Sequence, residues 1–300
     1  ADMEMLALSH VAKNFGEKQV LRDVSFAVPE HTVFGFVGQN GAGKTTAMRL
    51  ILGLLTLSGG EISVNGMPVR YGNTLTNRFV GYLPDVPEFY PYMTAKEYLR
   101  FCGEILGMPK KEIKNRCEEM LRLVGLDEEN HRIKGFSRGM KQRLGVAQAL
   151  FGRPKLLICD EPTSALDPAG RKELLDILTA AKEETTVLFS THILSDVEHI
   201  CDEMAFLHEG KIVLQGSLEE VRRRKKTSAV TVEMEQPKDT DILRQAFPSL
   251  KISGKNSLLL EEAEQLPELL HFIADRKCPV VRIERQETAL EDLFMEVVGR

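Results

Sequence analysis

The chain has 300 residues, of which 43% are hydrophobic and 28% charged, and its formal net charge is −5. This composition is typical of a globular protein with one large domain or two smaller ones, and it gives no electrostatic reason to expect nucleic acid as a partner. The longest apolar run, residues 50–57, is far shorter than the roughly 20 residues that cross a bilayer, so any membrane role would be exercised from outside it. The five cysteines show no C-x-x-C pair and no metal-ligand spacing, which predicts reduced core cysteines in a cytosolic protein.

The first elements are predicted to form a β-hairpin. Apolar positions over residues 6–11 and 20–28 indicate two antiparallel strands, joined by a turn at residues 14–18. Phe15 lies in that turn, where burial of an aromatic ring is not expected. Two interpretations stay open at this point. The ring is either a platform on which a base stacks or a minor packing contact under the turn.

Residues 38–46, GQNGAGKTT, match the phosphate-binding pattern G-x-x-x-x-G-K-[ST]. Glycines let the backbone curl so that successive N–H groups point inward, and the N-terminus of a following helix adds positive potential. Lys44 can reach the β- and γ-phosphates of a nucleotide, and the Thr45 hydroxyl can hold Mg²⁺. An apolar strand at residues 32–37 and a helix at residues 47–52 supply the strand–loop–helix context that the motif requires.

Two more strands are predicted between the P-loop helix and residue 87. One covers residues 61–64 and is followed by an Asn-Gly hairpin turn, and the other covers residues 78–83. Asp85 follows in a loop that two prolines hold extended.

Residues 94–150 are predicted to be helical. The sequence TAKE is a capping box that begins a helix at residue 94. Residues 110–124 carry an apolar stripe on one helical face, which we interpret as core packing. A third helix follows the stretch FSRGMKQR at residues 136–143 and continues to residue 150.

Two predicted apolar strands are each followed by side chains of the types found in catalytic sites. Residues 154–161 end in Asp160 and Glu161, and the strand at residues 186–190 is followed by His192. Short apolar runs of this kind are typical of parallel strands, whose carboxyl ends form ligand sites in α/β sheets. Alone, the acidic pair could be a solvated strand end and the histidine a structural residue, but the P-loop in the same chain favours a site. A hairpin over residues 204–214 follows.

After the basic run RRRKK at residues 222–226 the pattern resets. We interpret the run as a solvated helix end or linker, with contact to anionic lipid or an acidic partner surface as the alternative. The segments that follow predict a small α+β unit, so we divide the chain into domains 1–224 and 225–300, with a helical subdomain at about 88–150. The predicted strands of this unit are residues 230–234, 258–260 and 280–283, and its predicted helices are residues 239–247, 264–277 and 289–298.

The order of these motifs, from residue 4 to about 220, resembles that of the ATP-binding subunit of an ATP-binding cassette (ABC) transporter. The resemblance implies an α/β fold: a P-loop NTPase cassette with a mainly parallel core sheet, an antiparallel β subdomain and a helical subdomain, followed by a small C-terminal α+β domain. Asp85 replaces the glutamine usual in the family. That acid and the segment ETALEDLF at residues 287–294 are similar to a subgroup of drug, sodium and lipid exporters with an accessory domain.

The resemblance also implies residue roles. Glu161 is the general base for the attacking water, His192 the switch histidine near the γ-phosphate, and Lys44 a charge that neutralises the phosphates. Mg²⁺ is expected at Thr45, Asp160 and Asp85, and Phe15 becomes the aromatic ring that stacks on adenine. The ATP-binding residues implied in this way are Phe15, Gly38, Gln39, Asn40, Gly41, Ala42, Gly43, Lys44, Thr45, Thr46, Asp85, Ser137, Gly139 and Asp167.

The family signature Leu-Ser-Gly-Gly-Gln appears here as FSRGM, in which Ser137 and Gly139 retain the serine and the second glycine. In the family this signature completes the site of the opposite subunit, so the resemblance implies two ATP molecules held in a head-to-tail dimer, expected to be a homodimer. It further implies an ATPase that powers transport, with export as the expected direction, through a separate permease at the cytoplasmic face of the cell membrane.

Two other classes of function are considered. A soluble ABC ATPase that acts on ribosomes or DNA usually carries two cassettes or long coiled coils, and this chain has neither. A regulatory module without turnover would not need the intact pair Glu161 and His192.

Overall fold

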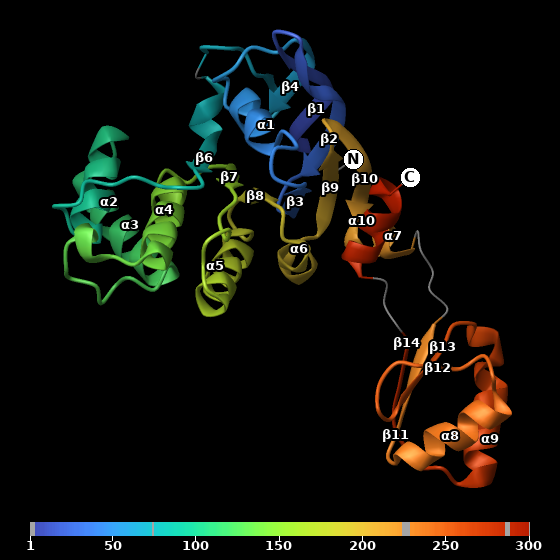
Figure 1. The fold of residues 1–300 in the computed structure, drawn as a ribbon. Coiled ribbons are helices and arrows are strands. Elements are labelled where there is room, and N and C mark those ends of the chain that lie inside the picture. The colour runs from blue at the N-terminus through green and yellow to red at the C-terminus, as the bar shows by residue number, and fades with distance from the viewer. Residues whose placement is uncertain (1–3, 74, 224–228, 286–288, 300) are drawn as a thin grey trace. The chain divides into compact units, whose positions relative to one another are not determined.

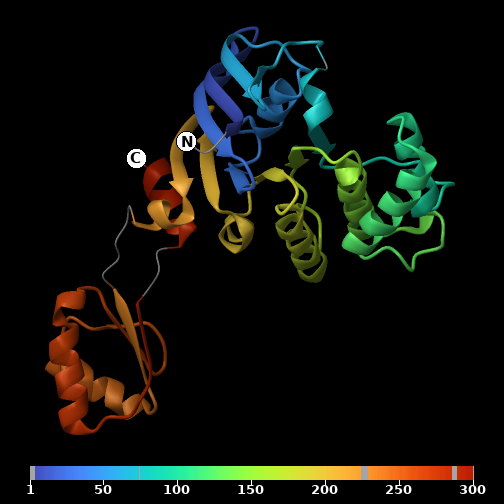
Figure 2. The same ribbon diagram turned by 180° about the vertical axis from the view of Figure 1, so that it is seen from behind.

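The computed structural model describes residues 4–73, 75–223, 229–285 and 289–299 (Figures 1 and 2). The chain forms two compact units, Ala1–Leu218 and Glu219–Arg300. The domain boundary predicted between residues 224 and 225 lies outside the described residues and stays a prediction, and parts of the stretches 222–226 and 287–294 lie outside them as well. Within the described ranges, no helix combines the length and apolar character needed to cross a membrane.

The first unit contains an antiparallel sheet in the order β2-β1-β4-β5. Strands β1 (Glu4–Phe15) and β2 (Lys18–Pro29) form the predicted hairpin, with Phe15 opposite Lys18 at its tip. The Asn-Gly turn between β4 (Gly59–Val64) and β5 (Met67–Pro68) is also confirmed. In β1 and β2, residues that face the interior alternate with exposed ones, which is the pattern of a sheet with one solvated face.

A six-stranded sheet in the order β10-β9-β3-β8-β7-β6 forms the centre of this unit. Pairing is parallel from β9 to β6, and only β10 is antiparallel, so the mainly parallel core sheet is confirmed. Every residue of the three central strands is buried. The six strands are β3 (Val33–Val37), β6 (Val80–Leu83), β7 (Leu156–Asp160), β8 (Thr186–Thr191), β9 (Glu203–His208) and β10 (Lys211–Ser217).

One predicted strand is shorter than expected. Residues 78 and 79 belong to a 3₁₀ helix, η1 (Thr76–Phe79), and pairing with β7 starts only at Val80, opposite Leu156. One further hydrogen bond joins the two segments, from the Lys155 N–H to the carbonyl of Phe79, but Phe79 already belongs to the 3₁₀ helix. Strand β6 therefore begins where that helix ends.

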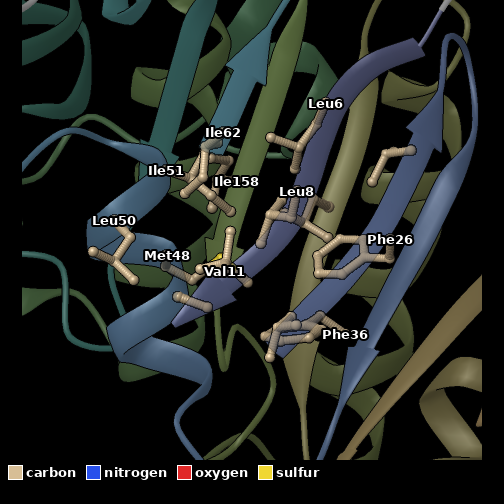
Figure 3. Close-up of a cluster of buried hydrophobic side chains, with 14 of the residues drawn as sticks. Leu6, Leu8, Val11, Phe26, Phe36, Met48, Leu50, Ile51, Ile62 and Ile158 are labelled. Carbon is tan, nitrogen blue, oxygen red and sulfur yellow. The ribbon is translucent and has the colours of Figure 1, made fainter. Parts of the chain in front are cut away.

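Helix α1 (Lys44–Ile51) lies between the two sheets and supplies the centre of the main core. Figure 3 shows Met48, Leu50 and Ile51 of this helix among side chains of β1, β2, β4 and β7. The helix that begins at the P-loop is thus packed on both sides, which holds the loop in a fixed place.

Helices α2 (Ala95–Ile105), α3 (Lys110–Leu123) and α4 (Arg138–Phe151), with the short η2 (Ile133–Gly135), form a helical layer to one side of the six-stranded sheet in both views (Figures 1 and 2). The capping box at Thr94 is present, and the predicted stripe on α3 is buried. Helices α5 (Pro168–Ala181) and α6 (Leu194–Ile200) pack against strands β3 and β8. The sequence had not indicated α6.

The second unit has the predicted α+β character. Its sheet has the order β12-β13-β11-β14 with antiparallel neighbours, and together with α8 and α9 it makes a split βαβ arrangement. Apolar residues of β11 and β13 pack with those of the two helices in a core of their own. The elements of this part are α7 (Leu218–Arg223), β11 (Val230–Met234), α8 (Pro237–Ala246), β12 (Lys251–Ile252), β13 (Ser257–Leu260), η3 (Ala263–Gln265), α9 (Leu266–Arg276), β14 (Val280–Arg285) and α10 (Leu290–Val298).

Candidate active site

Four adjacent parallel strands, β3, β8, β7 and β6, end at the same edge of the central sheet. The P-loop follows β3, His192 follows β8, Glu161 follows β7 and Asp85 follows β6. Residues 40–46 of the P-loop line one open cavity of about 1110 Å³ together with Asp85, Glu161, His192 and Phe15. The structure therefore brings together side chains from four loops at the edge where α/β sheets bind ligands.

The P-loop has the geometry of an anion site. Gly43 precedes helix α1 with φ 111°, and a Cβ there would lie 2.8 Å from the Leu21 side chain, so the position requires glycine. No side chain caps α1, and the N–H groups of its first turn have no intrahelical partner. Lys44 is buried, and its Nζ donates to the carbonyls of Gly38 at 2.5 Å and Gln39 at 3.1 Å. The helix terminus and the ammonium together favour negative charge in the cavity.

Glu161 lies between a cation and an imidazole. Its Oε1 is 3.0 Å from Lys44 Nζ, and its Oε2 is 2.8 Å from His192 Nδ1. The residue has φ 48°, a left-handed conformation that a glutamate rarely adopts, and its N–H donates to the carbonyl and the hydroxyl of Ser190. A strained backbone thus turns this carboxylate toward the cavity.

Asp160, one residue earlier, is buried, and its Oδ1 accepts a hydrogen bond from Ser190 Oγ at 2.7 Å. Thr45 is exposed in the first turn of α1. Across the described ranges, no group of three or more His, Cys, Asp or Glu side chains could hold a metal by itself. A hydroxyl and a carboxylate do fit Mg²⁺ in a nucleotide site, because that ion keeps waters and takes phosphate oxygens as further ligands.

Asp85 is held from three sides. Its Oδ1 accepts a hydrogen bond from Ser164 Oγ at 3.0 Å and lies 4.0 Å from a guanidinium nitrogen of Arg138. The Gln142 side chain donates to the Asp85 carbonyl at 2.8 Å. The acid thus links the loop after β6 to the turn after Glu161 and to the start of helix α4.

Some predicted residues lie elsewhere. The predicted residues Gly38, Gln39, Ser137, Gly139, Asp160 and Asp167 do not line the cavity. Ser137 caps α4 by accepting from the N–H of Met140, and Asp167 caps α5 by accepting from the N–H of Gly170. Both helix starts nevertheless remain at the surface, since these two caps are exposed.

Sequence reasoning missed several residues that line the cavity. Lys18 could have been found, because a hairpin with Phe15 at its tip must place its partner nearby. The others come from turns and strand ends without a motif, and nothing in the sequence distinguishes them. These missed residues are Lys18, Gln19, Val20, Arg22, Glu209 and Gly210.

Comparisons with known proteins agree with this geometry. The family described as "ABC transporter" matches residues 21–164, and the family described as "ATP-binding protein DrrA1-3-like, C-terminal domain" matches residues 216–298. The uncharacterized ABC transporter ATP-binding protein YxlF of Bacillus subtilis (strain 168) is 37% identical over 298 residues, which cover 98% of this chain and 99% of that protein. The bacitracin transport ATP-binding protein BcrA of Bacillus licheniformis is 33% identical over 301 residues, which cover 98% and 97%.

A solved structure described as that of the ATP binding subunit of an ABC transporter is 33% identical and superposes with a TM-score of 0.65, covering 73% of this chain and 92% of that one. The resemblance, the fold and the ATPase activity that the motifs implied are confirmed, and the two relatives above bear the names of transport ATP-binding proteins. The chain belongs to the ATP-binding proteins of ABC transporters, which means that it binds and hydrolyses ATP and drives transport through a separate membrane subunit.

Proposed function

We propose that ATP and Mg²⁺ bind in the cavity between the P-loop and Glu161, and that two copies of the chain complete each other's sites. The observation that carries this proposal is the convergence of Lys44, Glu161 and His192 within hydrogen-bonding distance at one sheet edge. Phosphoryl transfer to water needs mostly positioning and charge neutralisation, and these side chains offer both.

The chain's own residues divide the work in this proposal. The N–H groups of the P-loop and the Lys44 ammonium bind the β- and γ-phosphates, so Lys44 exchanges its contact with Glu161 for phosphate oxygens. Glu161 then accepts a proton from the attacking water, and His192, 2.8 Å from Glu161 Oε2, orients that carboxylate. Phe15 is half exposed at the mouth of the cavity and stacks on adenine.

Thr45 and Asp160 are the proposed Mg²⁺ ligands, with Asp85 as a further contact through water. The ion would neutralise charge on the phosphates. Asp160 is buried behind the cavity lining, and the hydrogen bond from Ser190 Oγ holds its Oδ1 in place. Asp85 lines the same cavity and is half exposed, so it is accessible to a hydrated ion.

We assign Ser137, Gly139 and Asp167 to the surface that closes the ATP site of a partner subunit. They are outside their own cavity, yet Ser137 and Asp167 lie at exposed helix starts whose N–H groups and dipoles favour a phosphate. A two-fold homodimer would bring each such surface to the partner's P-loop.

The membrane subunit is proposed to contact the hollow of about 550 Å³ that the Asp85 loop forms with α2. This hollow is lined mainly by aromatic and aliphatic side chains, of which Tyr90 and Ile105 are exposed, and Glu88 and Gln148 also line it. An apolar helix end of a permease is a suitable occupant, which would hold the cassette at the cytoplasmic face of the membrane. Export is the proposed direction, by analogy with the exporter subgroup.

Complementation between two inactive variants tests the shared site. Lys44→Ala removes the P-loop charge, and Ser137→Ala removes the signature hydroxyl, so each homodimer has two damaged sites. In a mixed dimer both changes fall in one site and leave the other intact. Mixing equal amounts should therefore restore ATP hydrolysis to about a quarter of the wild-type rate if dimers form at random. Activity that stays at the level of the separate variants would contradict the two-fold arrangement.

A further inference from the structure

A buried lysine lies against the ring of Phe15. Lys13 and Phe15 are two residues apart in β1, so their side chains share one face of the strand. Lys13 is 7% exposed, and its Nζ lies 4.8 Å from the centroid of the Phe15 ring. The same Nζ donates to the carbonyl of Thr56 at 2.7 Å and to its hydroxyl at 3.2 Å.

These contacts account for the ammonium group. It has three N–H donors, of which two reach Thr56, and the ring face takes the third direction. One face of Phe15 is therefore occupied by a cation. The ring is 48% exposed and lines the cavity, so its other face remains for a ligand.

The segment that holds Lys13 also connects the ring to the phosphate-binding helix. Thr56 lies shortly after the end of α1, and Ser58 braces the same strand: its N–H donates to the Ala12 carbonyl, and its hydroxyl accepts from the N–H of Asn14. The position of the ring is thus tied to the helix that begins with Lys44.

We propose that Lys13 is a positioning residue that clamps the Phe15 ring from behind and strengthens its stacking on the purine base of ATP. The cation draws π electrons toward itself and makes the open face of the ring less negative, which favours contact with an electron-rich base. The clamp also removes rotamers that the ring would otherwise lose on binding. This inference rests on the stacking role proposed for Phe15.

The test compares ATP with inorganic tripolyphosphate, which lacks a base but binds the same loop. Lys13→Met should weaken ATP binding about three- to tenfold, as expected for a partly desolvated cation–π contact, and leave tripolyphosphate binding unchanged. In hydrolysis the KM for ATP should rise while kcat stays the same. Lys13→Gln, which retains a donor for Thr56 but no charge, serves the same test if the methionine variant does not fold. Lys13→Arg, which keeps the positive charge, should bind ATP as tightly as the wild type.

Two further variants distinguish a failure of the clamp from a failure of the stacking role. Lys155 lies over the ring of Phe79 with its Nζ 5.7 Å from the centroid, away from the cavity, so Lys155→Met is a matched control that should change nothing. If Phe15→Ala weakens ATP binding but Lys13→Met does not, the clamp is wrong and the stacking role stands. If Phe15→Ala has no effect, the stacking role fails and the clamp with it. Equal weakening for ATP and tripolyphosphate in Lys13→Met would also overturn the clamp, because the lysine would then act on the P-loop.

Discussion

Arg171 and Asp196 form a partly buried ion pair next to the two loops that carry Glu161 and His192. Asp196 on α6 is 1% exposed, and its Oδ1 accepts from Arg171 of α5 at 2.6 and 2.9 Å. Its Oδ2 accepts from the hydroxyl of Thr163 at 2.6 Å. Thr163 lies two residues after Glu161, and Asp196 lies four residues after His192. Asp196 therefore joins the segment after Glu161 to the helix after His192, and Arg171 supplies its counter-charge.

Replacing Arg171 with methionine should lower the free energy of unfolding of the first unit by about 3–5 kcal/mol, because it leaves a buried carboxylate without its cation. We expect the lower end of that range, since Arg171 is 30% exposed and water can partly replace it. The double variant Arg171→Met with Asp196→Leu removes the charge altogether and should recover most of the loss. Lys182→Met breaks an exposed pair between Asp202 and the residue that follows α5, and it should cost about 1 kcal/mol or less.

Urea unfolding, monitored by tyrosine fluorescence, measures the free energy of unfolding of the first unit alone. The chain has no tryptophan, and its five tyrosines all lie within residues 71–98 of the first unit, so the signal does not include the second. Hydrolysis by Arg171→Met should show a lower kcat with a smaller change in KM, because Glu161 and His192 are displaced relative to each other. A single variant as stable as wild type, or a double variant as unstable as the single one, would refute the reasoning.

The other predictions concern the P-loop, the general base and the domain boundary. Lys44→Ala should abolish hydrolysis and weaken ATP binding, measured by a phosphate-release assay and by calorimetry, and normal turnover would contradict the P-loop role. Glu161→Gln should bind ATP but hydrolyse it about 10²–10⁴ times more slowly and accumulate a dimer with Mg-ATP; only monomer in size-exclusion chromatography would argue against this. A chain that ends at Lys226 should remain soluble and bind ATP, and loss of either property would show that the boundary is wrong.

Elements with a strong local pattern could be predicted from the sequence. The β1–β2 hairpin has alternating burial, and β3, β7 and β8 are apolar throughout because both of their faces are covered. The site followed from the same logic, since residues after parallel strands meet at one edge. Functional residues that directly follow parallel strands can therefore be predicted to lie close together before the order of the strands is known.

Elements that depend on their neighbours could not be predicted. Helix α6 has seven residues, too few for a helical period to stand out, and its place depends on packing against β3 and β8. Strand β6 starts only at Val80, because the residues before it form the 3₁₀ helix η1. The contact between Asp85 and Ser164 joins residues 79 positions apart, and no local pattern encodes it.

For Asp85, the role predicted from the sequence differs from the contacts that the structure shows, and an experiment can distinguish the two. The hypothesis assigns the carboxylate to Mg²⁺ through a bridging water, whereas in the structure Oδ1 contacts Ser164 and lies 4.0 Å from Arg138. Asp85→Asn retains an oxygen that can accept from Ser164 and removes only the charge. If the charge acts on the ion, the Mg²⁺ concentration for half-maximal hydrolysis should rise, by no more than about fivefold, since half-exposed charges interact by about 1 kcal/mol or less.

Ser164→Ala is the matched control, because it frees Oδ1 without changing the charge. That variant should need no more Mg²⁺ than wild type, since the carboxylate remains available to the hydrated ion. If Asp85 instead serves only to join the loop after β6 to the turn after Glu161, Ser164→Ala should lower kcat. The Mg²⁺ curves of Asp85→Asn and wild type would then coincide, and coincident curves would remove the residue from the proposed metal site.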